Sequence, residues 1–156
     1  MTHAMKIMTA VDLSEYSAAA VRYSVWLAMK IDAELVLTNV INQRDVDLVQ
    51  RSMAGYETFS FQNYLSDQEK ERKTKMKDLF EAVSPGTVKC RYLVQTGVPY
   101  RKLLSAIESE KPILMVVSTK GRSDLADAVV GSTARKIYRR SPIPLLTIPA
   151  GFNELP

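Results

Sequence analysis

The sequence has little of the chemistry that most enzymes and metal proteins use. Its 156 residues include one cysteine, Cys90, and one histidine, His3, which precedes the first apolar run. A single cysteine cannot form an internal disulfide, which is typical of proteins in a reducing compartment. A lone histidine near the N-terminus argues against Ser-His-Asp or Cys-His catalysis and against a zinc cluster. We therefore expect no metal centre of this kind and no histidine-dependent catalysis.

Long apolar runs and export signals are also missing. The run that follows Lys6 ends at Asp12, which makes it too short for the apolar core of a signal peptide. No stretch approaches the roughly 18 apolar residues of a membrane span. We therefore expect a cytoplasmic protein with no membrane partner.

The composition predicts one folded domain. Apolar residues make up 46% of the chain and charged residues 24%, which are ordinary values for a globular protein. The length fits a single domain, placed over residues 1–156 with its core over 6–149. The net charge of +4 is only mildly basic, and aromatic residues are not interleaved with the cations along the chain. For this reason no nucleic-acid partner is expected.

Short apolar runs alternate with helical patterns along the chain. Residues 42–60 show no clear period and are expected to form a loop, with room for a short helical piece. Ser14 is the expected N-cap of the first helix, and Pro99 fits the first turn of a later one. The apolar runs are interpreted as buried strands at 6–12, 34–41, 88–96, 113–118 and 145–148. The alternation predicts an α/β fold: an open, Rossmann-like, five-stranded parallel sheet with helices on both faces.

Two of the expected helices have distinctive surfaces. The helix over 61–83 is dense in both signs of charge between Asp67 and Lys77, which is typical of a solvated face. The helix over 132–140 is expected to bury Ala134, Ile137 and Tyr138 on one side.

A ligand site is expected beyond the carboxyl ends of the strands, where ligands bind in open parallel sheets. This rule points to three segments, namely 10–12, 39–41 and 118–133. In the third, Gly131 precedes Ser132 and Thr133 at the start of a helix, and Lys120 and Arg122 add positive charge. Unpaired helix amides next to a glycine favour a phosphate.

Each of these patterns also fits a purely structural role. Gly131 and Ser132 fit a plain turn and helix cap, and Asp12 fits the start of a helix as well as a ligand-binding carboxylate. The established nucleotide fingerprints are missing, because the chain has neither G-x-G-x-x-G after its first strand nor a P-loop. A nucleotide site in this chain must therefore have another design.

Four segments, in order, resemble the universal stress protein family. They lie at 10–14, 96–99, 115–134 and 141–146, and the resemblance runs from about Lys6 to Pro149. The nucleotide-binding branch of that family carries Gly-x2-Gly-x9-Gly-[Ser/Thr]. In this chain Gly121 and Gly131-Ser132 match the motif, and Ser118 stands in place of the first glycine.

The resemblance implies a site for ATP, ADP or AMP. The adenine and ribose would lie against Ala10, Val11, Asp12, Val117 and the backbone of Val40. The phosphates would lie against Ser118, Gly121, Arg122, Gly131, Ser132 and Thr133. Mg²⁺ would accompany the phosphates if Asp12, Asp124 or Asp127 positioned it.

The resemblance also implies a homodimer, paired through the last strand from Ile143 to Ile148. Such pairing removes an exposed apolar edge. The implied function is a stress-response protein whose bound nucleotide switches its partners or dimer state. The alternative is a dimeric interaction module of the same family that binds no nucleotide. An enzyme is not predicted, since a nucleophile elbow and an evident base are missing, although slow ATP hydrolysis stays open.

Overall fold

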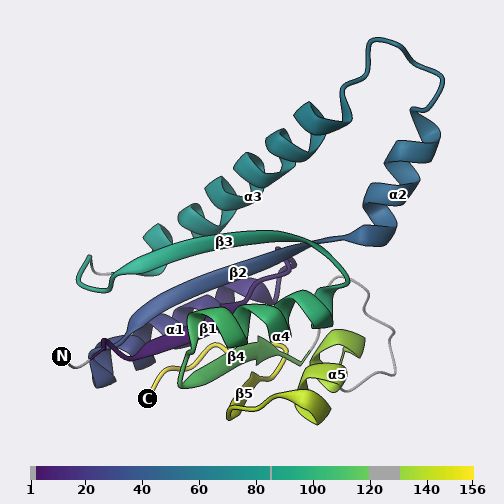
Figure 1. The fold of residues 1–156 in the computed structure, drawn as a ribbon. Coiled ribbons are helices and arrows are strands. Elements are labelled where there is room, and N and C mark those ends of the chain that lie inside the picture. Colours follow the sequence, from purple (N-terminus) through teal and green to yellow (C-terminus); the bar gives the residue numbers. More distant parts are fainter. Residues whose placement is uncertain (1–2, 85, 120–130) are drawn as a thin grey trace.

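A parallel sheet of five strands organises the molecule. The computed structural model describes residues 3–84, 86–119 and 131–156. The elements, in chain order, are β1 (Lys6–Ala10), α1 (Ser17–Ile31), β2 (Glu34–Asn42), α2 (Gln43–Ser52), α3 (Phe61–Val83), β3 (Cys90–Gly97), α4 (Pro99–Glu110), β4 (Leu114–Ser118), α5 (Ser132–Arg140) and β5 (Leu145–Ile148). The strand order is β3-β2-β1-β4-β5, and each neighbouring pair is parallel (Figure 1). The predicted open α/β sheet is confirmed.

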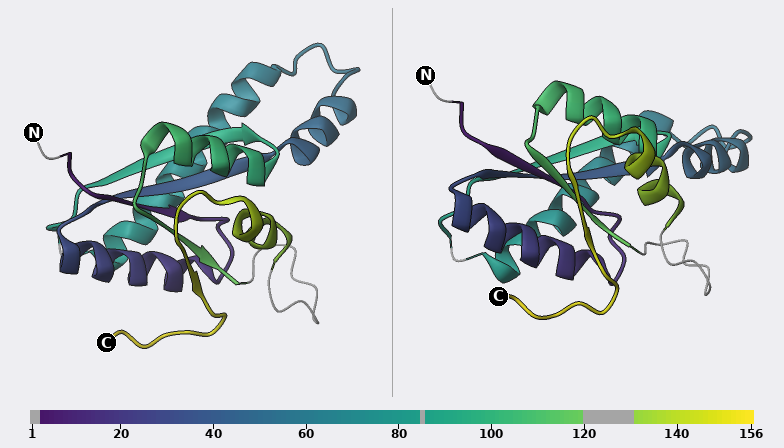
Figure 2. Two further views of the ribbon diagram at one scale, coloured as in Figure 1. Left: turned by 60° about the horizontal axis from the view of Figure 1, so that its bottom comes forward. Right: turned by 90° about the horizontal axis from the view of Figure 1, so that it is seen from below.

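Helices cover both faces of the sheet. Ile7 of β1 and Leu35 of β2 point to one face, where they pack with α1 and Met76 of α3. Met8 and Val36 point to the other face, where they pack with Leu103 of α4 and with α5. Figure 2 shows α1 and α3 on one side of the sheet and α4 and α5 on the other. Because the two-residue strand period places successive side chains on opposite faces, continuous apolar strands suit this sandwich of layers.

Residues 42–60 contain a regular helix, α2, where mainly a loop was expected. Asn42 caps the helix, and its side-chain oxygen accepts a hydrogen bond from the backbone N–H of Arg44 at 3.1 Å. Val46 is the buried residue of α2, so only a small part of this short helix packs against the core. Together with the first part of α3, α2 extends beyond the end of the sheet (Figure 1).

The first helix begins two residues later than predicted, at Ser17, where the expected N-cap Ser14 would have started it at Glu15. Its N-cap is Tyr16, which makes no side-chain capping bond, so the expected capping by Ser14 was wrong. The Ser14 hydroxyl instead accepts from the N–H of Tyr16 at 3.3 Å, within a turn that places Leu13 at a φ of 63°. The carboxylate of Asp12 holds this turn together, which gives the chain a tight exit from β1.

The charged stretch of α3 is a solvated face, as predicted. Exposed i,i+4 ion pairs join Lys75 to Glu71 at 2.8 Å and Lys77 to Glu81 at 3.8 Å, and Met76 faces the core. Arg72 departs from this pattern, because it lies at the cavity described below.

Tyr138 of α5 was expected in the core, and this expectation was wrong. Ala134 and Ile137 are buried against the sheet, whereas Tyr138 is 76% exposed. Each helical residue turns about 100° from the previous one, so the position after Ile137 already faces away from the sheet.

Cys90 begins β3 and packs at the border of the α1–α3 core. Burial disfavours the thiolate and raises the pKa of Cys90 to about 11. At neutral pH the side chain is therefore a protonated thiol, which is a poor nucleophile and a poor metal ligand.

Candidate functional site

A cavity of about 440 Å³ opens at the carboxyl edge of the sheet. This volume lies within the usual range for small-molecule sites, about 300–1,000 Å³. The cavity is lined by Ala10, Val11, Asp12, Thr38, Asn39, Val40, Asn42, Asp45, Arg72, Pro99, Leu103, Val117, Ser118, Gly131, Ser132, Thr133 and Ala134.

Nine of the residues expected from the sequence meet in this cavity, namely Ala10, Val11, Asp12, Val40, Val117, Ser118, Gly131, Ser132 and Thr133. They come from three separate segments, which the fold brings together because all the strands end at the same edge. The two other expected residues, Gly121 and Arg122, lie outside the described residues, as do Lys120, Asp124 and Asp127.

The first turn of α5 forms one end of the cavity. Its N-cap is Gly131, so Ser132 is not the helix cap, and in the described part of the chain no side chain caps the helix. The amides that open a helix have no intrahelical partners and carry a partial positive charge. Among the described residues, a Cβ built on Gly131 would meet the carbonyl oxygen of Thr119, at 3.8 Å, and no other atom within 4 Å. This end of the cavity therefore offers backbone amides to an anion with little steric obstruction.

Ser118, at the end of β4, lines the same end of the cavity. Its hydroxyl donates a hydrogen bond to the carbonyl oxygen of Tyr16 at 3.2 Å. Ser118 thus fastens the start of α1 to β4, and its hydroxyl proton is engaged there. At the position where the family motif has a glycine, this chain has a serine whose side chain forms a hydrogen bond within the structure.

Asp12 organises the turn that follows β1. Its Oδ1 accepts from the N–H of Ser14 at 3.0 Å and from the hydroxyl of Ser17 at 2.9 Å. The residue is partly buried and lines the cavity. Asp12 therefore has the structural role at the start of a helix that the sequence left open. The same hydrogen bonds hold its carboxylate at the edge of the cavity.

Asn39 and Arg72 also line the cavity. Asn39 lies in the segment 39–41 to which the sequence pointed, whereas nothing in the sequence indicated Arg72 as a site residue. Asn39 is 2% exposed, and its Nδ2 donates to the carbonyl oxygen of Val11 at 2.7 Å. Its Oδ1 accepts from the guanidinium of Arg72 at 2.9 Å. This chain of bonds fixes the backbone of β1 where it borders the cavity. A buried asparagine inside an apolar strand was the one signal in the sequence, whereas Arg72 resembled the other charges of its helix.

The remaining polar lining comes from the start of α2. Asn42 and Asp45 lie at the cavity on the same side as Arg72. Donors and acceptors therefore gather at the β2 end, and anion-binding amides lie at the α5 end.

The described residues contain no group of three His, Cys, Asp or Glu side chains that could hold a metal ion. Of the carboxylates considered for Mg²⁺, Asp12 is the one that the structure describes. No helix in the described ranges has the length and apolar character needed to span a membrane.

Comparisons with known proteins agree with this picture. A family model described as the universal stress protein family matches residues 3–149. Universal stress protein MJ0577 of Methanocaldococcus jannaschii is 22% identical over 152 residues, with 92% of this chain and 93% of the relative covered. Universal stress protein YxiE of Bacillus subtilis is 26% identical over 146 residues, with coverage of 92% and 97%.

Solved structures share the fold at lower identity. The structure of hypothetical protein MJ0577 superposes with a TM-score of 0.76 at 20% identity, covering 97% of this chain and 100% of that one. A universal stress protein in complex with cAMP gives 0.63 at 18% identity, with coverage of 94% and 98%. One from Archaeoglobus fulgidus in complex with dAMP gives 0.62 at 11% identity, with coverage of 95% and 99%.

Proposed function

The chain belongs to the universal stress protein family, and from this premise we propose that it binds ATP or a related adenine nucleotide in the cavity at the carboxyl edge of its sheet. The observation that carries the proposal is the start of α5. Its amides open on the cavity without a side-chain cap, next to a glycine that leaves room for a ligand. The complexes of family members with cAMP and dAMP support an adenine ligand.

The two ends of the cavity suit the two ends of a nucleotide. The phosphates would lie beside Gly131 on the amides of Ser132 and Thr133, where the helix dipole favours negative charge. The N–H of Gly131 itself donates to the carbonyl oxygen of Thr119 at 2.7 Å. The base would lie between Ala10, Val11, Val40 and Val117, and its edge would meet backbone groups of β2. Asp12 would accept from a ribose hydroxyl. Mg²⁺, if it accompanies the phosphates, would be held mostly by them and by water.

The protein would act through binding, without rapid turnover. No histidine lines the cavity, and the described carboxylates there, Asp12 and Asp45, offer no pair with an evident base role. The bound nucleotide would switch partners or dimer state in the stress response, in the cytoplasm. The competing function is a dimeric interaction module without nucleotide, which the retained Gly131-Ser132 and the open cavity disfavour.

The dimer would form along β5. Among the described strands, β5 pairs only with β4, so its outer edge is open. An open apolar edge invites pairing with another strand, and an identical strand closes it by two-fold symmetry.

Nucleotide content is the direct test of this function. Freshly purified protein is denatured, and the supernatant is analysed by ion-pair chromatography. We expect near-stoichiometric adenine nucleotide. A supernatant without nucleotide, together with no binding by the stripped protein, would leave the interaction module as the function.

Arg72→Ala is expected to weaken ATP binding about tenfold, because a charge-assisted hydrogen bond of the cavity wall is lost. Lys73→Ala removes the same charge from an exposed neighbouring position and should leave affinity unchanged. Calorimetric titration of both variants measures the difference. Equal affinities would show that Arg72 plays no part in the site.

A further inference from the structure

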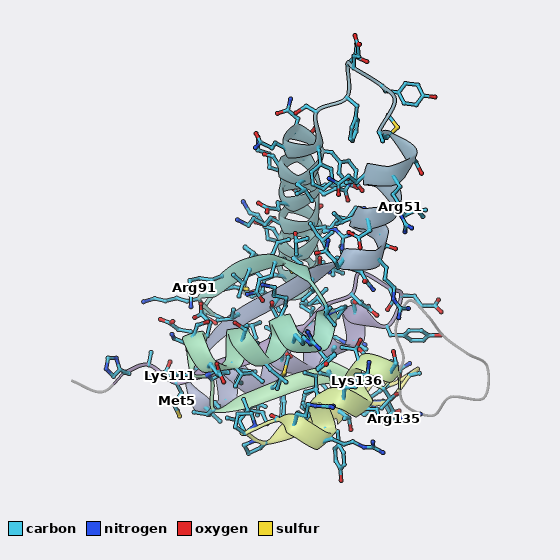
Figure 3. The ribbon with its side chains drawn as sticks, turned by 45° about the vertical axis from the view of Figure 1, so that its right-hand side comes forward. Met5, Arg51, Arg91, Lys111, Arg135 and Lys136 are labelled. Carbon is cyan, nitrogen blue, oxygen red and sulfur yellow. The ribbon has the colours of Figure 1, made fainter. Side chains whose placement is uncertain are left out.

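Helix α5 concentrates positive charge on the surface. Arg135, Lys136, Arg139 and Arg140 are all exposed, and the nine-residue helix contains no acidic residue. Lys136 lies on the side of α5 toward α4, and Arg135 lies farther from it (Figure 3). Like charges at this density repel one another and cost stability. An anionic partner would relieve that repulsion.

Tyr100, in the first turn of α4, gathers part of this charge. The ammonium of Lys136 lies 4.9 Å from the centre of the phenol ring, and the guanidiniums of Arg140 and Arg101 lie at 5.2 and 5.7 Å. The Nε–H of Arg101 also donates to the phenol oxygen at 3.1 Å. This hydrogen bond and the nearby cations lower the pKa of Tyr100. The ring attracts cations to its face and so keeps three of them together.

Within the part of the chain that the structure describes, no carboxylate forms an ion pair with this cluster. None of the ion pairs among the described residues includes Arg101, Lys136 or Arg140. The acidic residues of α4 lie at its other end, at Glu108 and Glu110, and Glu110 pairs with Lys6 and Arg91. The surface formed by α5 and the first turn of α4, which we call the α5 surface, therefore carries positive charge that no described carboxylate pairs with.

Tyr138 adds an open aromatic ring to the same helix. It is 76% exposed, and it lies one turn after Arg135 and directly before Arg139. The ring contacts found within the described residues do not include Tyr138. An exposed aromatic side chain among cations is the combination that single-stranded nucleic acids use, since bases stack on the ring and phosphates pair with the cations.

We propose that the α5 surface binds single-stranded nucleic acid, with Tyr138 stacked on a base and Arg135 and Arg139, which are its neighbours around the helix, on the phosphates. Lys136 and Arg140, on the side of α5 toward Tyr100, add positive charge that attracts the strand. An acidic polypeptide would use the cations but not the open ring of Tyr138. A second copy of the chain would bring the same positive charge and be repelled. The proposal reverses the expectation from the sequence that the chain has no nucleic-acid partner. Tyr100 is far from α5 along the chain, and only the fold places it beside Lys136 and Arg140.

The test uses the full chain and a fluorescein-labelled oligonucleotide of twelve uridines, followed by fluorescence anisotropy at about 0.15 M salt. The double variant Arg135→Ala/Arg139→Ala should bind at least tenfold more weakly. The slope of the logarithm of the binding constant against the logarithm of the salt concentration should be shallower by about 1.4 for this variant. Each phosphate contact on a single strand contributes about 0.7 to that slope, and the variant loses two contacts. The control variant Lys70→Ala/Lys73→Ala has the same net charge and should bind like the unmodified protein.

Tyr138 is tested separately. Tyr138→Ala should weaken binding about fivefold or more through lost stacking, and Tyr138→Phe, which keeps the ring, should stay within about twofold. Gly131→Val should leave oligonucleotide binding intact, which separates this surface from the nucleotide cavity. A thymidine oligonucleotide should bind comparably if stacking and phosphate contacts dominate.

Several results would overturn the proposal. One is no binding at about 0.15 M salt, and another is an equal loss in both double variants. Competition by polyglutamate as strong as that by unlabelled oligonucleotide would identify an acidic protein as the partner. A Tyr138→Ala variant that binds the oligonucleotide normally but becomes monomeric would assign Tyr138 to the interface between copies.

Discussion

Replacing Gly131 with valine is expected to abolish ATP binding and to leave the fold intact. Gly131 has a φ of −62°, which any residue adopts, and among the described residues its Cβ direction is open apart from an ordinary contact with Thr119. The backbone therefore tolerates a side chain. The valine methyl groups would occupy the space where the phosphates approach the α5 amides, so affinity should fall at least 100-fold.

The control is Gly55→Val, since a Cβ at Gly55 meets nothing within 4 Å and the glycine lies outside the cavity lining. The free energy of unfolding of both variants should lie within about 1 kcal/mol of that of the unmodified protein. At Gly131 the reason is that replacing a glycine N-cap with valine costs no more than that order. Circular dichroism and thermal melting check the fold, and calorimetry checks binding. Normal ATP affinity of Gly131→Val would place the nucleotide elsewhere.

Replacing Thr147 with proline is expected to convert the proposed dimer, paired along β5, to a monomer. The carbonyl oxygens of Pro144 and Ile148 accept from Met115 and Thr119 of β4, so the backbone groups of Thr147, at the intervening odd position, face the open edge. Proline at that position removes an outward N–H and adds a ring where a second strand would pair. The ladder between β4 and β5 loses no hydrogen bond, so the chain should still fold.

Thr147→Val keeps the N–H and a strand-forming side chain, and it should remain dimeric. Sedimentation velocity over a range of concentrations distinguishes the two variants. If Thr147→Pro stays dimeric, the copies do not pair along β5. If it loses its fold by circular dichroism, Thr147→Glu, which adds charge to the same edge, provides the second test.

The fold could be predicted from the sequence because the apolar runs and the helical segments between them indicate the same architecture. Continuous apolar runs such as 113–118 mark strands buried on both faces, and the helices between them require parallel crossovers. Most of the candidate site was predictable for the same reason. Once the strands are parallel, Asp12, Val40 and Gly131 must lie at one edge.

The rest depended on contacts between elements that are far apart in the sequence. Arg72 has the same chemistry as the neighbouring charges of α3, and only its bond to Asn39 distinguishes it. Helix α2 spans only ten residues and buries only Val46, so its apolar pattern was too brief to mark it as a helix. The spacing of Tyr138 predicts a core position. The rotation of α5 against the sheet instead leaves this side chain exposed.

The central claim, adenine nucleotide binding at the carboxyl edge, is tested most directly by calorimetric titration of ATP into nucleotide-free protein. We expect micromolar binding, or roughly −8 kcal/mol, close to one nucleotide per chain, which Gly131→Val removes and Gly55→Val preserves. An absence of heat at several temperatures, with no shift of the melting temperature in ATP, would contradict it.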